Sequence, residues 1–284
     1  MVSTDFPVDI ARTFMAPKED MPKIGFLGGE QGKEINEAIK KDYKGFGNLG
    51  QGYYREKDKI VWNVSNPFYT VAVQDRLPQG VRVATQSDLE KALKLDSLNL
   101  SDICATTSLV LRSEEEPNSY LARDLMNQIK TRENRKLELP VMIPLCGLSL
   151  KKDDESSYGL SFKLKEDAEI IPAPILDIIS QDWINHYEKE IRVSNYMRLF
   201  HSPNFFRFYS KDINPETGLP NKVYDRDDPS SWPKKKQRSL DNSRTSRGLS
   251  FLVTNECDIN SGLYELNYSP GVGRVIIVSP GNEK

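Results

Sequence analysis

A strict alternation of apolar and polar side chains constrains the fold of this chain more than any other feature. In the run Leu160–Leu164, Leu160, Phe162 and Leu164 alternate with polar residues, which places the three apolar side chains on one face of a β-strand. The run Leu148–Leu150 alternates in the same way, and the linker at 151–157 is almost entirely polar. We therefore predict an antiparallel pair of strands joined by a solvent-exposed loop.

The tripeptide Gly-Leu-Ser occurs three times, beginning at Gly147, Gly159 and Gly248, and an apolar residue follows each time. The simpler interpretation is that a glycine opens a strand at each of these places. The alternative is an internal duplication, although the spacing between the three copies is irregular.

Helices are predicted where apolar residues recur every three to four positions. The best case runs from Ser119 to Thr131, because Leu121, Leu125 and Ile129 recur at intervals of four. A capping-box pattern, Ser87 followed by Glu90, predicts a helix that continues to about residue 95. Further helices are expected at Lys33–Tyr43 and Ile175–Arg192.

Segments rich in β-branched and aromatic residues predict further strands. They lie at 59–64, 68–73, 81–83, 109–111, 248–254, 263–268 and 274–278, and the aromatic segment 200–209 is expected to be a strand or an edge of the core. Strands and helices do not alternate regularly, which disfavours a doubly wound parallel sheet. The sequence therefore predicts an α+β fold, a largely antiparallel sheet with two or three helices packed on one face.

The predicted organisation has three parts: an extended N-terminal tail (1–22), an N-terminal α+β region (23–131) and a β-rich C-terminal region (137–284). The charged connector between residues 131 and 136 is the predicted boundary, and one continuous domain is the alternative. Residues 211–247 contain many Pro, Asp, Ser, Lys and Arg, and we expect a long polar excursion there.

Composition narrows the functional classes. The 284 residues carry a formal net charge of −2, so the whole chain has no strong attraction to nucleic acid or to an anionic membrane. Apolar runs are too short for a transmembrane helix, and residues 1–10 have no signal-peptide pattern. Three distant cysteines, Cys104, Cys146 and Cys257, argue against a disulfide framework. We expect a soluble, cytoplasmic protein with no membrane contact.

Several familiar site motifs are incomplete. Gly45–Gly50 has the spacing G-x-G-x-x-G, but a dinucleotide site needs a strand before it and a helix after it, and here the predicted order is reversed. The segment Gly28–Lys33 lacks the first glycine and the Ser or Thr of a phosphate-binding loop. His186 and His201 are the only histidines; with three distant cysteines they do not make a zinc site, and no cofactor is predicted.

Two candidate sites lie in the polar excursion. Carboxylates suit a hard divalent cation, which makes Asp225, Asp227 and Asp228 candidate metal ligands. A basic segment follows Trp232, and cationic side chains near aromatic residues suit phosphate or nucleic-acid contact. Its residues are Lys234, Lys235, Lys236, Arg238, Arg244 and Arg247.

No pattern of nucleophile and base, metal ligands or phosphate loop is complete, so the leading hypothesis is a non-catalytic binding or assembly protein, with a protein partner. One alternative is a metal-dependent enzyme acting on a phosphate-bearing substrate through Asp225–Asp228 and the basic segment. The other is nucleic-acid binding through the basic segment without catalysis. The sequence leaves open whether the protein is an enzyme.

Overall fold

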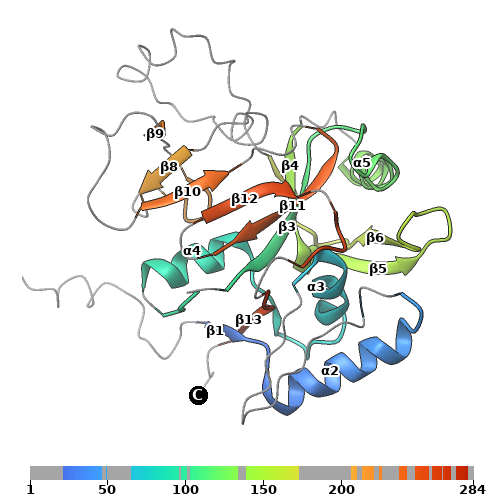
Figure 1. Ribbon diagram of the computed structural model, residues 1–284, viewed down its shortest axis with the longest axis horizontal. Helices are drawn as coiled ribbons and strands as arrows, with labels where there is room; N and C mark the ends of the chain where they lie inside the picture. The colour runs from blue at the N-terminus through green and yellow to red at the C-terminus, as the bar shows by residue number, and fades with distance from the viewer. Residues whose placement is uncertain are drawn as a thin grey trace, which may run out of the picture.

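A computed structural model gives the fold (Figure 1). It describes residues 22–46, 49, 65–95, 97–100, 103–133, 139–172, 206–209, 213–220, 224–225, 237–241, 247–255, 258–263, 265–269 and 273–280. The described helices are α2 (Gly29–Asp42), α3 (Pro67–Gln74), α4 (Gln86–Lys94) and α5 (Ser119–Glu133), with a 3-10 turn, η1 (Leu145–Gly147).

The strands are β1 (Lys23–Phe26), β2 (Arg82–Val83), β3 (Ala105–Leu111), β4 (Val141–Pro144), β5 (Leu148–Lys152), β6 (Leu160–Leu164), β7 (Ile171–Pro172), β8 (Phe206–Tyr209), β9 (Tyr224–Asp225), β10 (Gln237–Asp241), β11 (Leu249–Thr254), β12 (Asp258–Leu263) and β13 (Ile276–Ser279). An eight-stranded sheet has the order β7-β4-β3-β11-β12-β10-β8-β9, and a smaller sheet has the order β1-β13-β2. All the paired strands run antiparallel except β10 with β12. The predicted α+β fold with a largely antiparallel sheet is confirmed.

The predicted strand pair forms the third sheet, the hairpin β5–β6, with Leu148 opposite Leu164 and Leu150 opposite Phe162. The ring of Phe162 stacks on Phe68 of α3, with the ring centroids 4.7 Å apart. The alternation read from the sequence therefore directs the apolar face of the hairpin into the core.

One large core joins the sheet to the helices. Leu121, Leu125 and Ile129 of α5 are buried there, as their spacing predicts. Buried residues of α2 and α3 join the same cluster, together with Leu109 of β3 and Phe251 of β11. A second, smaller cluster lies between α4 and β13.

The segment 68–73 is a helix, so the predicted strand is wrong. Asn66 caps α3 by accepting a hydrogen bond from the Tyr69 amide at 2.8 Å, and Pro67 occupies the first helical turn, both typical of a helix start. Every residue from Pro67 to Val73 is buried. Burial on all sides removes the helical periodicity, and β-branched and aromatic residues then resemble a strand.

Other observed helix and strand boundaries differ from the predicted ones. The capping box of α4 uses Thr85 and Asp88 rather than Ser87 and Glu90. The strand predicted at 263–268 lies earlier, as β12, and Leu266 is in a turn. In the polar excursion, β9 and β10 add strands where a loop was expected, and both pair with β8. The predicted strand 59–64 and helix Ile175–Arg192 lie outside the described residues.

The recurring Gly-Leu-Ser segments each open a strand, β5, β6 or β11, as the simpler interpretation predicts. Gly159 has φ +66° and Gly248 has φ +67°, a conformation that favours glycine. A side chain at Gly248 would also lie 2.2 Å from the carbonyl oxygen of Pro117. Backbone geometry thus explains the glycine in two copies, and the duplication stays untested.

The eight-stranded sheet crosses the predicted domain boundary. β3 precedes the connector, and its neighbours β4 and β11 follow it. The division into regions itself stays a prediction. Across the described part of the chain, no helix combines the length and apolar character needed to cross a bilayer.

Candidate functional site

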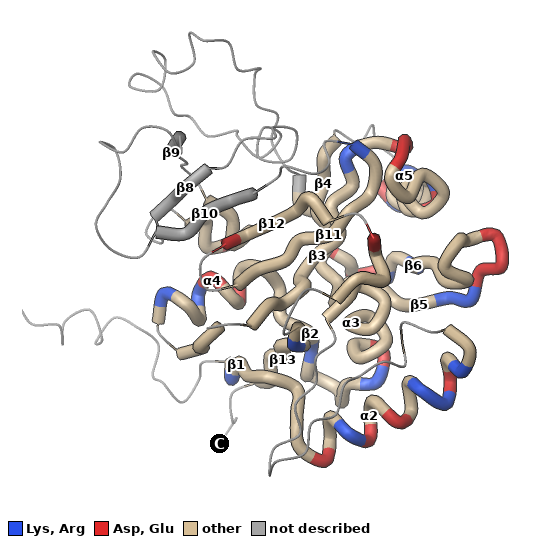
Figure 2. The backbone as a smooth tube through the Cα atoms, in the orientation of Figure 1, with Lys and Arg blue, Asp and Glu red and all other residues tan. Residues whose placement is uncertain are grey.

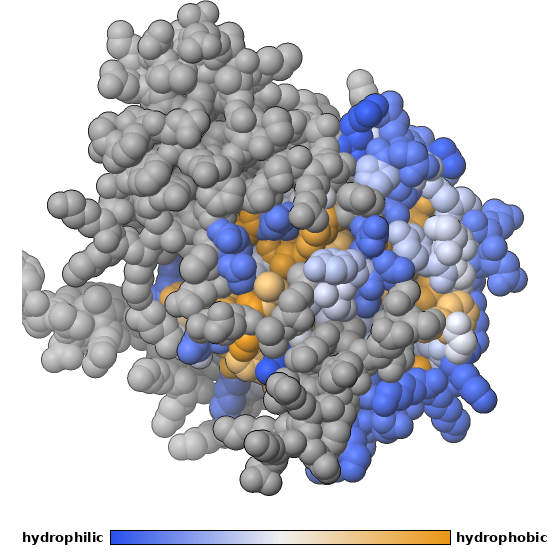
Figure 3. Space-filling model, in the orientation of Figure 1, coloured by the Kyte–Doolittle hydropathy of each residue, from blue (hydrophilic) through white to orange (hydrophobic). Residues whose placement is uncertain are grey.

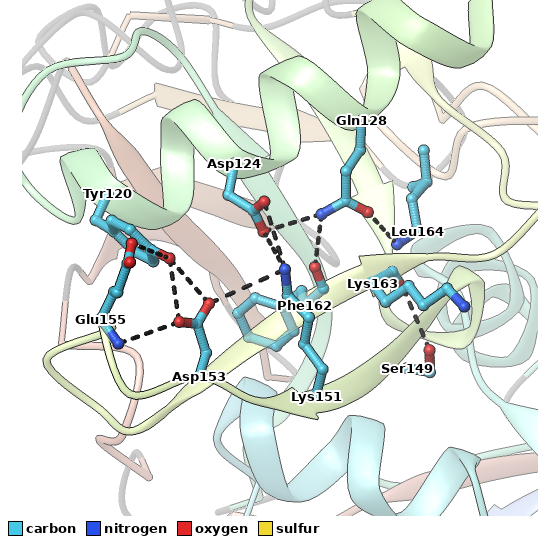
Figure 4. Close-up of polar contacts among 10 residues, drawn as sticks. All are labelled: Tyr120, Asp124, Gln128, Ser149, Lys151, Asp153, Glu155, Phe162, Lys163 and Leu164. Carbon is cyan, nitrogen blue, oxygen red and sulfur yellow. Dashed lines mark hydrogen bonds and ion pairs between the residues drawn. The ribbon is translucent and has the colours of Figure 1, made fainter.

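A polar cluster of the described residues lies between α5 and the β5–β6 hairpin (Figure 4). Tyr120, Asp124 and Gln128 follow one another at intervals of four on α5, which places them on one side of the helix. An adjacent side of the helix contributes Leu121, Leu125 and Ile129 to the core. The polar residues Tyr120, Asp124 and Gln128 of α5 therefore face the hairpin.

Gln128 fixes the helix to the edge of β6. Its Nε2 donates to the carbonyl oxygen of Phe162 at 2.8 Å, and its Oε1 accepts from the Leu164 amide at 2.8 Å. The amide side chain thus occupies main-chain groups that an added strand would use. Nε2 also donates to Asp124 at 2.9 Å, which orients that carboxylate.

Asp153, at the start of the hairpin loop, is the centre of the second half of the cluster. The Tyr120 hydroxyl lies 3.1 Å from both carboxylate oxygens of Asp153, and 3.5 Å from Glu155 Oε2. The Glu155 amide donates to Asp153 Oδ1 at 3.2 Å. These contacts hold the loop against α5 and keep the tyrosine hydroxyl directed at a carboxylate.

The environment moves two pKa values away from neutrality. The neighbouring Ser161 hydroxyl and the hydrogen bond from the Tyr120 hydroxyl lower the pKa of Asp153, because they stabilise the ionised form. Desolvation and the nearby carboxylates raise the pKa of Tyr120 to about 12. Near pH 7, Asp153 is therefore ionised and Tyr120 is protonated.

The surface carries an excess of negative charge. Lys151 is the cation within the cluster, with Nζ 3.3 Å from Asp124 Oδ2 and 4.0 Å from Asp153 Oδ2. Asp124, Asp153 and Glu155 supply the carboxylates, and the acidic tip of the hairpin projects into solvent (Figures 2 and 4). Such an arrangement suits a cationic group on a partner. Among the described residues no group of three or more His, Cys, Asp or Glu is placed to hold a metal ion.

The predicted metal ligands are only partly located. Asp225 lies in β9, at the position opposite Phe206 of β8. Asp227 and Asp228 lie outside the described residues. Whether the three carboxylates converge therefore stays a prediction.

The predicted basic segment is located at two positions. Arg238 lies in β10, opposite Phe208 of β8. Arg247 is exposed and forms an ion pair with Glu115 at 3.3 Å, which reduces the charge that it offers to a ligand. The other four residues lie outside the described part of the chain: Lys234, Lys235, Lys236 and Arg244. Because β8 pairs with β10 on one side and with β9 on the other, the described parts of the acidic and basic segments lie in the same sheet, separated by one strand.

Sequence reasoning missed the cluster on α5. The four-residue spacing of Tyr120, Asp124 and Gln128 was available, but it equally describes a solvated helix face. The carboxylates of 153–155 were interpreted as an ordinary hairpin loop. Their contact depends on how α5 packs against the hairpin, and the pair Tyr120–Asp153 spans 33 residues of sequence.

Comparisons of this chain with protein-family models, with curated proteins and with solved structures find no match.

Proposed function

We propose that this chain is a non-catalytic binding or assembly protein and that the surface between α5 and the hairpin contacts a cationic segment of a protein partner. The observation that carries the proposal is geometric: Asp124, Asp153 and Glu155 are held on one surface by contacts between α5 and the hairpin loop, with Lys151 as the cation beside them. Carboxylates gathered in this way attract a cationic group. Because carboxylates outnumber cations on this surface, we expect the segment of the partner that binds it to be positively charged.

A charge-neutralising variant tests this proposal. Asp153→Asn with Glu155→Gln removes two negative charges, and Glu166→Gln with Asp167→Asn is a matched control because both residues are exposed on another loop. Binding of a labelled oligolysine peptide is measured by fluorescence anisotropy at low and high salt. Each lost contact is worth about 0.2–1 kcal/mol, so the first variant should bind about 2- to 30-fold more weakly.

Two outcomes contradict the proposal. One is that the wild-type protein does not bind oligolysine even at low salt. The other is that both double variants lose affinity equally, because the effect is then one of net charge and not of this surface. Labelled oligoglutamate serves as the probe of opposite sign and should not bind the acidic tip.

The second candidate function uses the segments around β8. β9 and β10 lie on either side of β8, so Asp225 and Arg238 are two strand spacings apart in one sheet, about 10 Å at about 4.8 Å per spacing. This favours retaining a phosphate-directed function, as a metal-dependent enzyme or a nucleic-acid-binding protein. The variant with Ser at Lys234, Lys235, Lys236 and Arg238 tests this second function, because it removes the cations that would contact phosphates.

The cytoplasmic location is also a proposal. Cys104 and Cys146 are free thiols in the structure, and an odd number of distant cysteines is typical of proteins from a reducing compartment.

A further inference from the structure

A second charged surface lies where α2 ends, on the other side of the hairpin from α5. Four cations meet there from three separate parts of the chain: Lys41 and Lys44 at the end of α2, Arg76 just after α3, and Lys152 at the end of β5. We call these four residues, with Tyr43 and Phe46, the α2-end surface. Figure 2 shows the basic positions at the end of α2 and on β5, and Figure 3 shows hydrophilic residues along α2 and at the hairpin tip, with paler and orange residues between them.

Two aromatic rings organise these cations. Tyr43 and Phe46 pack edge to face, with their centroids 6.2 Å apart and an angle of 77° between the rings. The Arg76 guanidinium lies 5.3 Å from the Tyr43 ring centroid, and Lys152 Nζ lies 5.9 Å from that of Phe46. These are cation–π distances, so the rings hold both cations over one aromatic pair.

The hairpin fixes the position of this aromatic pair. A Cβ atom built at Gly159 would lie 2.8 Å from the ring of Phe46, so the ring rests directly on the glycine at the start of β6. Gly159 also has φ +66°, which favours glycine for backbone reasons. The α2-end surface is thus built by contact between two distant segments of the chain.

The surface has more positive than negative charge. Two carboxylates oppose the four cations. Asp42 forms an ion pair with Arg76 at 2.6 Å, and Asp75 pairs with Lys165 at 3.5 Å. Burial, and to a smaller extent the charge of Asp75, raise the pKa of Tyr43. A hydrogen bond from Arg76, and the charges of Arg76, Lys41 and Lys152, lower the pKa of Asp42, which shows that these cations share one electrostatic environment.

Three lysines remain without a carboxylate partner. Lys41, Lys44 and Lys152 are exposed, and none forms a salt bridge with a carboxylate of the described residues. Other lysines on the same helices and hairpin do form such ion pairs: Lys33, Lys40, Lys130, Lys151 and Lys165. A lysine at a helix C-terminus also stabilises the helix dipole, which accounts for Lys41 but not for Lys152, which lies on a strand.

We propose that the α2-end surface binds single-stranded nucleic acid, with its cations on the phosphates and the Tyr43–Phe46 pair beside the bases. Lysine and arginine neutralise phosphates and release their counterions. Aromatic side chains add contact with bases that are not paired in a duplex. An anionic membrane fits less well, because the exposed large apolar residues of the described chain, Leu95 and Tyr268, are not part of this surface.

Two triple variants of equal net charge test the proposal. The first replaces Lys41, Lys44 and Lys152 by Gln. The control replaces Lys91, Lys94 and Lys163 by Gln; these are also exposed, two at the end of α4 and one on β6. Binding of a short labelled polyuridine oligonucleotide is measured by fluorescence anisotropy across a salt series, after circular dichroism has shown that both variants are folded.

The first variant should bind at least about tenfold more weakly at low salt. The slope of log affinity against log salt should become shallower by about 2, since each phosphate contact on a single strand contributes about 0.7. The control should stay within about twofold of the wild-type protein, because it loses the same charge elsewhere.

Four outcomes overturn the proposal. The first is no binding by the wild-type protein at low salt, and the second is an equal loss in the two triple variants. The third is an equal affinity for inorganic polyphosphate or a higher affinity for duplex DNA, because the unpaired bases then contribute nothing. In the fourth, only the variant with Ser at Lys234, Lys235, Lys236 and Arg238 loses binding, which assigns the contact to the 234–247 segment.

Discussion

Arg112 is buried at the end of β3, with 3% of its surface exposed. Its guanidinium donates to the Ser250 hydroxyl at 2.5 Å and to the carbonyl and hydroxyl oxygens of Ser261 at 2.9 and 2.8 Å. Desolvation lowers the pKa of Arg112 to about 9, because burial disfavours the charged form. These hydrogen bonds connect the end of β3 to β11 and β12. The Arg112 side chain therefore stabilises the middle of the sheet.

We predict that Arg112→Ala lowers the free energy of unfolding by about 2–4 kcal/mol. The substitution leaves a cavity and removes donors from buried serine and carbonyl oxygens. Arg247→Ala is the matched control, because Arg247 is exposed and its ion pair with Glu115 is a surface contact, worth under about 1 kcal/mol. Urea denaturation measures both, and an equal effect of the two substitutions would contradict the prediction.

At the scale of elements, the Gln128 side chain joins α5 to the backbone edge of β6. Gln128 satisfies both the carbonyl oxygen of Phe162 and the amide of Leu164, so the edge of β6 is closed without another strand. We predict that Gln128→Ala destabilises the protein by about 1–3 kcal/mol, the cost of leaving such groups unpaired. It should also speed hydrogen exchange at the Leu164 amide.

Asn127→Ala is the control for this element, since Asn127 is the exposed neighbour of Gln128 on the same helix. The change in helix propensity is similar in the two substitutions. If exchange at Leu164 is as slow in Gln128→Ala as in Asn127→Ala, the amide does not close the edge of β6 in solution.

The helices and strands also show where patterns in the sequence predict secondary structure correctly. The hairpin and α5 are both amphipathic, so each displays its own period, two for β6 and about four for α5. By contrast, α3 is buried on all sides and displays no period. The signal that remained was local, an Asn66-Pro67 pair in which Asn66 caps the helix and Pro67 opens it. The polar first half of β3 was missed because Thr106, Thr107 and Ser108 are buried inside the sheet.

At the scale of the whole molecule, both charged surfaces depend on contacts between distant segments. The hairpin separates an acidic surface, around Asp153, from a basic one, around Lys152. Consecutive residues of β5 point to opposite sides, so one strand serves both surfaces. The sequence predicts the hairpin, but not the neighbours on its two sides, because α2 and α5 are placed by the packing of the entire core. Candidate sites chosen from the polar excursion therefore missed both surfaces.

The carboxyl groups with displaced pKa values also act together on stability. Among the described residues they are Asp42, Asp88 and Asp153, and all three pKa values are lowered. For Asp88, burial alone would raise the pKa, but hydrogen bonds from Arg82 and Thr85 outweigh it. When the folded-state pKa is lower than the unfolded one, the unfolded chain binds more protons in acid. This stabilisation is therefore complete above the ordinary value of 3.8 and is lost as the pH falls through the folded-state values.

We therefore predict that the urea midpoint is nearly constant close to neutrality and falls steadily below about pH 5. Asp88→Asn should lower stability at pH 7, because it breaks the ion pair with Arg82, and should make the decline in acid shallower, because one titrating group is gone. Asp167→Asn, at an exposed position, should leave both the midpoint and its pH dependence unchanged. If Asp88→Asn loses as much stability between pH 5 and pH 2 as the wild-type protein does, the buried capping box is not a source of the acid sensitivity.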